Sequence, residues 1–355
     1  MFYIYHIITL IQNLLTIFRH LNINFLVSGK YLSVIIPVYN EEKNLEILYK
    51  ELKPVLESIG KKYEIIFVDD GSSDNSLNIL RQFVRSDSTI KIIKLLSNFG
   101  QSAAIAAGLE NAEGENIITM DADLQHDPKD IPKLLKKLED GYHVVCGWRK
   151  NRSKSDSLFK KAIPSCIFNF LIVHLFKLNG LHDVVGGMRA FKKEVAQEIQ
   201  IYGEMHRFLP VLAAWKGFKI TEEAIHIRKR HHGNSKYGAS RFIRGFLDLL
   251  TVKYFISYFK RPLHIFGTIG LLLSGTGFLI DVYLLIEKFF FHVHLAVEHL
   301  PLLLLSILLI IVGVNFLFLG FIADMISLNL ILTKKPKLYM IEKIETARTI
   351  SQKEL

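Results

Sequence analysis

Cysteine is scarce in this sequence, with two residues among 355. Cys146 and Cys166 lie in apolar surroundings, and neither belongs to a Cys-x-x-Cys pair. A disulfide framework needs several cysteines and a structural zinc site needs closely spaced ligands, so the sequence excludes both kinds of scaffold. We therefore expect two reduced, buried thiols.

Charged residues are almost missing from two long stretches. Residues 300–323 carry no charge, and residues 263–286 are apolar apart from His264 and Asp281. Each stretch has about 24 residues, which at about 1.5 Å per residue crosses a hydrocarbon core of about 30 Å. The sequence therefore predicts a hairpin of two transmembrane helices. Asp281 and Asp324 fall near the water interfaces, where we expect a structural role.

The amino-terminal residues lack the pattern that is typical of a signal peptide, so we do not expect one there. Residues 2–18 are apolar but include His6, Gln12 and Asn13. No basic region precedes them, and no small-residue cleavage pattern follows. We expect an interfacial helix within an extension of residues 1–30.

Basic residues outnumber acidic ones by 44 to 34, which gives a formal net charge of +10. They cluster beside the predicted spans rather than alternating with aromatic residues, which favours an anionic membrane surface over nucleic acid as the partner. Lys260 and Arg261 precede the first span, and Lys334 and Lys335 follow the second. The positive-inside rule then places the soluble domain and the carboxyl terminus in the cytoplasm.

Short β-rich runs alternate with helical patterns between residues 31 and 147. We predict strands at 32–38, 63–69, 90–95, 116–121 and 143–147, and helices at 42–59, 74–86, 100–112 and 128–139. This alternation indicates an α/β fold with a mostly parallel sheet and helices on both faces. Such an architecture is typical of nucleotide-binding domains.

The most informative motif is Met120-Asp121-Ala122-Asp123-Leu124-Gln125-His126. Strand side chains alternate between two faces, so we expect Asp121 and Asp123 to point the same way. Two hard oxygen ligands suit Mg²⁺ or Mn²⁺, which completes its shell with substrate phosphates and water. The alternative is that the pair caps the next helix or faces water.

Two earlier strands also end in polar residues, at residues 39–42 and 69–74. Ligands of open α/β sheets bind just beyond the carboxyl ends of the strands. We therefore expect three strand ends to converge on one crevice.

Four motifs in this order, residues 34–42, 68–74, 98–101 and 121–125, resemble glycosyltransferase family 2, and within it the polyisoprenyl-phosphate glycosyltransferases. The resemblance implies a Rossmann-like GT-A domain, followed by amphipathic interface helices and a two-helix transmembrane hairpin. We assign an apolar extension to 1–30, the GT-A domain to 31–237, an amphipathic juxtamembrane helix to 238–261, the two transmembrane helices to 262–333 and a basic tail to 334–355.

The resemblance also implies which residues hold the donor. The nucleotide-sugar ligands would be Pro37, Tyr39, Glu41, Asp69, Asp70, Gln101 and Asp121, and the metal ligands would be Asp121, Asp123 and Gln125. Alternatively, Glu41 and Glu42 complement a helix dipole and Asp74 is an N-cap, which is the role we favour for Asp74.

The acceptor implied by the resemblance is a polyisoprenyl phosphate. Its phosphate ligands would be Arg149, Lys160, Lys161, Arg230, Ser235 and Lys236. Residues 230–236 match the family's Arg-x-x-Gly-x-Ser-Lys element. A guanidinium can bind phosphate bidentately and a lysine adds a point charge.

Asp183 opens a stretch, residues 183–191, that resembles the family's acidic and Gly-x-Arg element, with Met188 in place of the usual aromatic residue. It is our candidate for the residue opposite the anomeric carbon and, with Asp123, for a catalytic role. Because a lipid phosphate is already ionised at pH 7, Asp183 need not be a strong base and can orient groups or stabilise charge instead.

The helical pattern at 238–261 interleaves aromatic residues with Arg241, Arg244 and Lys253, which suits a bilayer surface; the alternative is a core-packing helix. Gly267, Gly270, Gly275 and Gly277 would permit close contact between transmembrane helices, which would allow a homo-oligomer, while the sequence leaves the oligomeric state open.

The sequence thus predicts an integral membrane, inverting glycosyltransferase. It would move a hexose from UDP-glucose or GDP-mannose to undecaprenyl or dolichyl phosphate on the cytoplasmic leaflet. A processive polysaccharide synthase is one alternative, but the region around Trp215 lacks a Gln-x-x-Arg-Trp element and two spans cannot enclose a pore. The second alternative is a non-catalytic partner of a lipid flippase. Such a protein would not need the metal ligands Asp121, Asp123 and Gln125.

Overall fold

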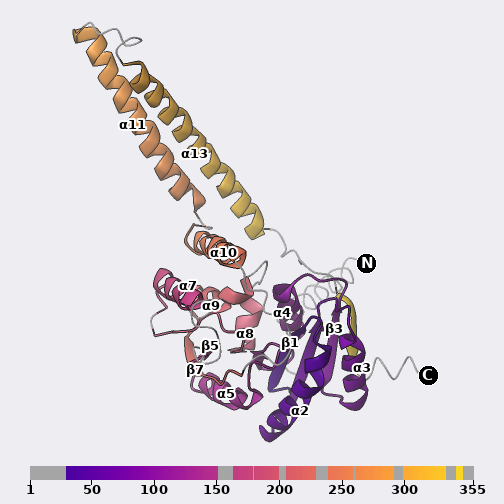
Figure 1. Ribbon diagram of the computed structural model, residues 1–355. Coiled ribbons are helices and arrows are strands. Elements are labelled where there is room, and N and C mark those ends of the chain that lie inside the picture. Colours follow the sequence, from indigo (N-terminus) through magenta and orange to yellow (C-terminus); the bar gives the residue numbers. More distant parts are fainter. Residues whose placement is uncertain are drawn as a thin grey trace, which may run out of the picture. The chain divides into compact units, whose positions relative to one another are not determined.

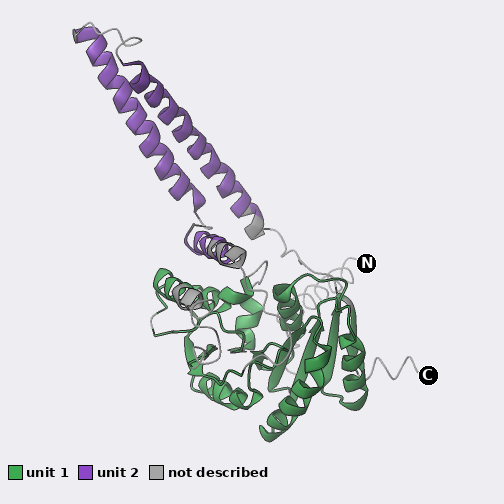
Figure 2. Cartoon of the chain, viewed as in Figure 1, with its two compact units in different colours: residues 1–242, 338–355 green, residues 243–337 purple. Residues whose placement is uncertain are grey.

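The computed structural model describes residues 29–150, 163–178, 180–199, 205–228, 239–258, 261–291, 299–332 and 341–346. Residues 1–242 with 338–355 form one compact unit, and residues 243–337 form a second (Figure 2). Several predictions fall outside the described residues: the interfacial helix within 1–30, and the phosphate ligands Lys160, Lys161, Arg230, Ser235 and Lys236.

The first unit is built on an eight-stranded sheet of order β7-β5-β6-β4-β1-β2-β3-β8 (Figure 1). The strands are β1 (Leu32–Val38), β2 (Tyr63–Asp69), β3 (Ile90–Leu95), β4 (Asn116–Thr119), β5 (Val144–Trp148), β6 (Arg189–Lys192), β7 (Ile220–Ala224) and β8 (Ile341–Thr346). Strands β1 to β4 pair in parallel, whereas β6 and β8 are antiparallel to their neighbours. The sheet is therefore mixed, with the predicted parallel strands at its centre.

Helices cover both faces of this sheet. They are α2 (Glu42–Ser58), α3 (Ser76–Ser86), α4 (Gln101–Glu110), α5 (Ile131–Glu139), α7 (Ile163–Leu175), α8 (Lys193–Glu198) and α9 (Leu209–Trp215), with 3-10 turns η2 (Pro128–Asp130) and η4 (Met205–Phe208). Val34 and Ile36 share a buried cluster with residues of α2, α3 and α5. Ile35 points to the other face, where it contacts α4 at Gly108. The predicted α/β class is confirmed.

Strand β4 is shorter than predicted. It ends at Thr119, and Leu124 has a φ of 61°, which marks a turn beyond the strand. The alternation of a strand therefore does not apply to Asp121 and Asp123, and that part of the argument for their alignment is wrong. The positions of the Asp121 and Asp123 side chains are instead set by the turn that follows β4.

The tail predicted for residues 334–355 contains a strand that the sequence did not indicate. Strand β8 pairs antiparallel with β3 at the edge of the sheet. Arg81 of α3 donates two hydrogen bonds to the buried Glu345, at 3.1 and 3.0 Å. A run as polar as Ile-Glu-Lys-Ile-Glu-Thr has weak strand character by itself, so its conformation depends on pairing with β3.

The second unit contains α10 (Ala239–Tyr258), which begins in the first unit, and the long helices α11 (Pro262–Phe291) and α13 (Leu300–Leu332). Within residues 262–290 and 300–327, windows of 18 residues have mean hydropathies of 2.0 and 3.0, and only 17% and 11% of these windows are buried. Both helices are therefore long and apolar enough to cross a membrane, and they expose their side chains as lipid-facing helices do.

Small residues let α11 and α13 pack closely. A Cβ on Gly270 would lie 2.6 Å from the carbonyl oxygen of Gly313, and one on Gly277 would lie 2.7 Å from that of Ser306. The Ser306 hydroxyl also donates to Asp281, which gives this acid the structural contact predicted for it. Gly270 and Gly277 thus serve packing within the hairpin, while Gly275 meets nothing within 4 Å. The homo-oligomer stays a prediction.

Candidate active site

The loops that follow β1 and β2 are tied together by side chains. Asn40, at a φ of 57°, accepts a hydrogen bond from the backbone N–H of Ser73 at 2.8 Å. The Asp74 carboxylate accepts from the N–H groups of Ser76 and Glu42, at 3.0 and 3.1 Å, and so caps the starts of both α3 and α2. Burial raises the pKa of the Asp74 carboxyl, but the Ser76 side chain and these two N–H groups lower it by more, so the pKa lies below its usual value.

The two acids at the end of β2 differ in what they bind. Asp69 is fully buried; one oxygen accepts from Ser72 N–H at 3.2 Å, and the other has no partner among the described residues. Asp70 accepts from the N–H groups of Phe99 and Gly100, at 2.7 and 2.9 Å. Asp70 therefore fixes the loop before α4, a role that the motif did not reveal. Burial raises its pKa, and these two hydrogen bonds oppose the rise.

The other predicted donor ligands lie at the end of β1. Pro37 is half-buried in the strand, and the Tyr39 ring is 43% exposed, so it is open to stacking. Glu41 occupies the N-cap position of α2 and accepts from the Asn44 amide at 2.6 Å. This contact agrees with the helix-terminal role considered for Glu41, while its contact with a nucleotide stays a prediction.

Three segments meet at Asp121. The Gln101 amide, from the first turn of α4, donates to Asp121 Oδ1 at 2.7 Å, and His126 Nε2 lies 3.8 Å from Oδ2. A Cβ on Gly187 would overlap Asp121 Oδ2, so the loop before β6 also lies against this carboxylate. The structure thus brings together Gln101 and Asp121, as predicted from separate motifs.

The groups around Asp121 favour its ionised form. Burial raises the pKa of the Asp121 carboxyl, but the neighbouring His126, His206 and Arg189 side chains hold this pKa below its usual value. His126 is buried beside it and had no role in the sequence prediction. Its place directly after the acidic motif was the one available signal.

Asp123 and Gln125 lie on the same turn. Asp123 is 6% exposed, and its Oδ1 accepts from the Gln125 N–H at 3.1 Å. Across the part of the chain that the structure describes, no three His, Cys, Asp or Glu side chains form a metal cluster. Two carboxylates and an amide oxygen nevertheless fit Mg²⁺ or Mn²⁺, because these ions take their remaining ligands from phosphates and water.

Asp183, which is buried, forms an ion pair with the half-buried Arg149. Arg149 Nε and Nη2 donate to the two carboxylate oxygens of Asp183, at 2.5 and 2.8 Å. The Asn169 amide of α7 donates to Asp183 Oδ1 at 3.2 Å and accepts from the Val184 N–H at 3.1 Å. The motifs assigned Arg149 to the acceptor phosphate and Asp183 to catalysis, whereas the structure joins them. A phosphate contact for Arg149 stays a prediction.

Two further side chains support this region and were missed from the sequence. Glu222 of β7 accepts from the backbone N–H groups of His182 and Asp183, at 2.6 and 3.3 Å. Arg189 of β6 is buried and donates to the carbonyl oxygens of His206 and Val184, at 2.9 and 3.3 Å. The Gly-x-Arg element signalled Arg189, but nothing near Glu222 indicated its contacts.

Replacing Arg149 by methionine is expected to lower the free energy of unfolding by about 3 kcal/mol, because it leaves the buried Asp183 carboxylate without its cation. The double variant Arg149→Met/Asp183→Asn is expected to regain most of this loss, since no buried charge remains. Thermal unfolding in detergent measures both. Equal stability of the wild type and Arg149→Met would show that the pair does not hold the site together.

Residues 33–200 match the family described as glycosyl transferase family 2. The dodecaprenyl-phosphate galacturonate synthase of Rhizobium johnstonii is 38% identical over 300 residues, which cover 83% of this chain and 87% of that protein. The aligned length therefore exceeds that of the sheet domain alone.

Solved structures share the fold. Glucosyl-3-phosphoglycerate synthase from Mycobacterium tuberculosis, in complex with Mn²⁺, UDP and glucosyl-3-phosphoglycerate, matches with a TM-score of 0.50 at 16% identity, over 63% of this chain and 80% of that one. Its complex with Mn²⁺, UDP-glucose and phosphoglyceric acid also matches with a TM-score of 0.50 at 16% identity, over 63% of this chain and 80% of that one. At this identity the likeness concerns the fold alone.

Proposed function

Because the chain belongs to glycosyl transferase family 2, we propose that it transfers a sugar from a nucleotide-diphosphate donor to a polyisoprenyl phosphate. Family membership confirms the predicted resemblance, the GT-A class of the fold and the prediction of a glycosyltransferase. The observation that carries the proposed acceptor is the 38% identity, over 83% of this chain, to a relative named as a polyprenyl-phosphate sugar synthase.

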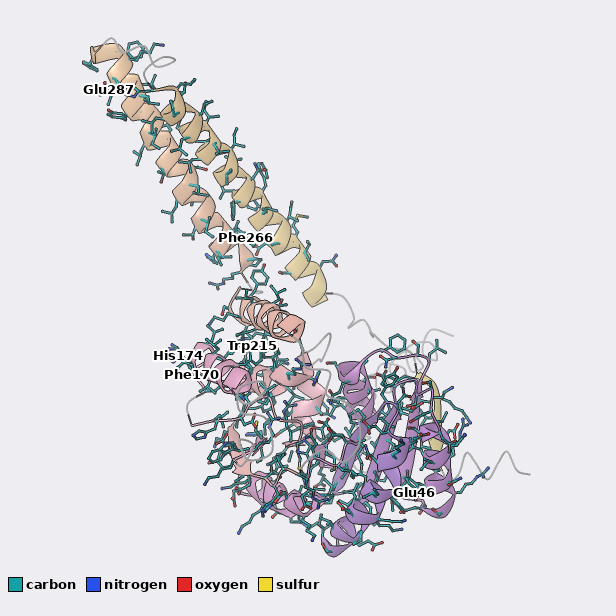
Figure 3. All side chains as sticks on the ribbon, viewed as in Figure 1. Glu46, Phe170, His174, Trp215, Phe266 and Glu287 are labelled. Carbon is teal, nitrogen blue, oxygen red and sulfur yellow. The ribbon has the colours of Figure 1, made fainter. Side chains whose placement is uncertain are left out.

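We place the reaction at a membrane surface. Helices α11 and α13 are the candidate spans, and exposed apolar residues also occur on α7 and α10. On α7, Phe170 is 67% exposed and stacks on His174 with 5.9 Å between ring centroids (Figure 3). On α10, Leu247 and Leu250 are exposed, which suits an interfacial helix. The cytoplasmic orientation remains a proposal based on the flanking cations.

We propose that Asp121, Asp123 and Gln125 hold Mg²⁺ or Mn²⁺. When bound, the ion would offset the negative charge that builds on the departing nucleoside diphosphate. Asp69 would contact the nucleoside, because its buried Oδ2, which has no partner within the described parts of the chain, suits an N–H donor. Pro37, Tyr39, Glu41 and Asp70 complete the proposed nucleoside side of the site.

On the acceptor side, we propose direct attack of a phosphate oxygen on the anomeric carbon, which inverts its configuration. The phosphate is already ionised, so the protein must attract and orient it rather than remove a proton. Asp183, fixed by Arg149 and Asn169, would orient the reacting sugar. The proposed phosphate ligands are Arg149, Lys160, Lys161, Arg230, Ser235 and Lys236.

The test is a transfer assay with the purified full chain, Mn²⁺ and undecaprenyl phosphate. UDP-glucose, GDP-mannose, UDP-N-acetylglucosamine and UDP-galacturonate are compared, the last because the Rhizobium relative is named for that sugar. We expect one donor to yield a glycolipid with a single added sugar, dependent on metal and lipid phosphate. Polymeric product would support a processive synthase instead. No product and no nucleotide binding would overturn the proposal.

A further inference from the structure

The loop that carries the proposed metal ligand Gln125 is attached along one side to the segment that follows β7. His126 and Ile227 form an antiparallel bridge, and the Arg228 N–H donates to the Gln125 carbonyl at 2.9 Å. Further along, the His226 N–H donates to the buried Asp130 at 2.6 Å. Residues 225–228 therefore run beside residues 125–130.

The Arg228 side chain adds a second attachment. Its Nη2 lies 2.8 Å from Asp127 Oδ2, and its Nη1 lies 2.5 Å from Glu51 Oε2 of α2. Asp127 is two residues beyond Gln125, while Glu51 is in the middle of a helix whose other face is packed in the core. The guanidinium thus connects the loop to a rigid element.

Charge explains why the loop needs this connection. Residues 121–130 contain four carboxylates, Asp121, Asp123, Asp127 and Asp130. Like charges this close repel one another when no metal is bound. Lys133 and His226 pair with Asp130, and Arg228 pairs with Asp127, so the end of the loop is neutralised and held in place.

We propose that Arg228 is a positioning residue for the divalent metal: it holds the turn so that Gln125 stays aligned with Asp121 and Asp123. The inference rests on the proposed function, because it takes these three residues as the metal ligands. Arg228 lies outside the Arg-x-x-Gly-x-Ser-Lys element, which begins at Arg230, and acts through Asp127 rather than on the substrate.

The test measures Mn²⁺ binding to the purified full chain, with UDP present, by the electron paramagnetic resonance of free Mn²⁺. Arg228→Met is expected to weaken Mn²⁺ binding about tenfold, as is usual when a group supporting metal ligands is lost. The Mn²⁺ concentration for half-maximal transfer should rise equally, while kcat at saturating Mn²⁺ changes less than about threefold. Arg228→Lys should restore part of the affinity, because it keeps one charged contact.

The matched control is Arg81→Met, which makes the same substitution at an arginine that donates two hydrogen bonds to one carboxylate, Glu345, at the β8 edge of the sheet. It is expected to lower the melting temperature without changing Mn²⁺ binding. If Arg228→Met does not fold, Asp127→Asn removes the other member of the same ion pair and should weaken Mn²⁺ binding by a similar factor.

The outcomes separate the inference from the proposed function. Unchanged Mn²⁺ binding in a folded Arg228→Met or Asp127→Asn variant would overturn the role of Arg228 and leave the proposed function intact. A wild type that transfers sugar without binding Mn²⁺ would overturn the metal assignment and this inference together.

Discussion

Replacing Asp123 by asparagine is expected to lower the transfer rate by about three orders of magnitude while the protein still folds. Asparagine has the same size, and its carbonyl oxygen can still accept the hydrogen bond that Gln125 N–H donates to Asp123 Oδ1. The substitution removes only the negative charge at the proposed metal site. A factor of 10³ corresponds to about 4 kcal/mol, within what one metal contact contributes to a charged transition state.

The measurement is glycolipid formation over a series of Mn²⁺ and Mg²⁺ concentrations, together with thermal unfolding of the same samples. Asp140→Asn is the matched control, because Asp140 is an exposed residue at the end of α5. It should leave activity and stability unchanged. If Asp123→Asn kept more than about a tenth of the wild-type rate at saturating metal, Asp123 would not be a metal ligand.

Gly187→Ala is expected to lower transfer about a hundredfold. The added Cβ would overlap Asp121 Oδ2 and lie 2.8 Å from His126 Nε2. Asp121 is held on its other oxygen by Gln101, so the carboxylate and the loop before β6 must separate. Displacing a reacting group by about 1 Å commonly costs about 10² in rate.

Transfer rate, Mn²⁺ affinity and melting temperature of this variant are compared with those of Gly29→Ala. A Cβ at Gly29 meets nothing within 4 Å, so this control receives the same substitution without a clash. We expect Gly187→Ala to weaken both Mn²⁺ binding and transfer. Wild-type values for both would mean that the Gly187 loop does not lie against Asp121 in the working enzyme.

The central strands were predictable because each is a buried apolar run bounded by polar turns. Strand β1 and strand β2 have the predicted limits, 32–38 and 63–69. Strands β6, β7 and β8 were not predicted, because they are short and rich in charged residues. Such segments become strands only when a neighbour supplies the hydrogen bonds, and that neighbour is far away in the sequence.

The site residues also include some that the sequence indicated and some whose contacts only the structure revealed. Asp69 and Asp121 could be proposed from the sequence because parallel strands bring the segments at their carboxyl ends to one edge of a sheet, and their contact with a donor stays a prediction. The contacts of Asp70 with residues 99–100, of Arg149 with Asp183, and of Arg228 with Asp127 were not found. Each joins residues between about 29 and 101 positions apart.

The amino-acid sequence by itself determined the α/β class, the two apolar segments long enough to cross a membrane, and the motifs that resemble glycosyltransferase family 2. These properties depend on local composition, periodicity and short spacings. Only the tertiary structure decided which charged groups pair, where the acidic turn lies after β4 ends, and which strands complete the sheet. Those outcomes depend on distances between segments that are remote in sequence. The residues next to a charged side chain or an edge strand do not indicate which distant residue will pair with it.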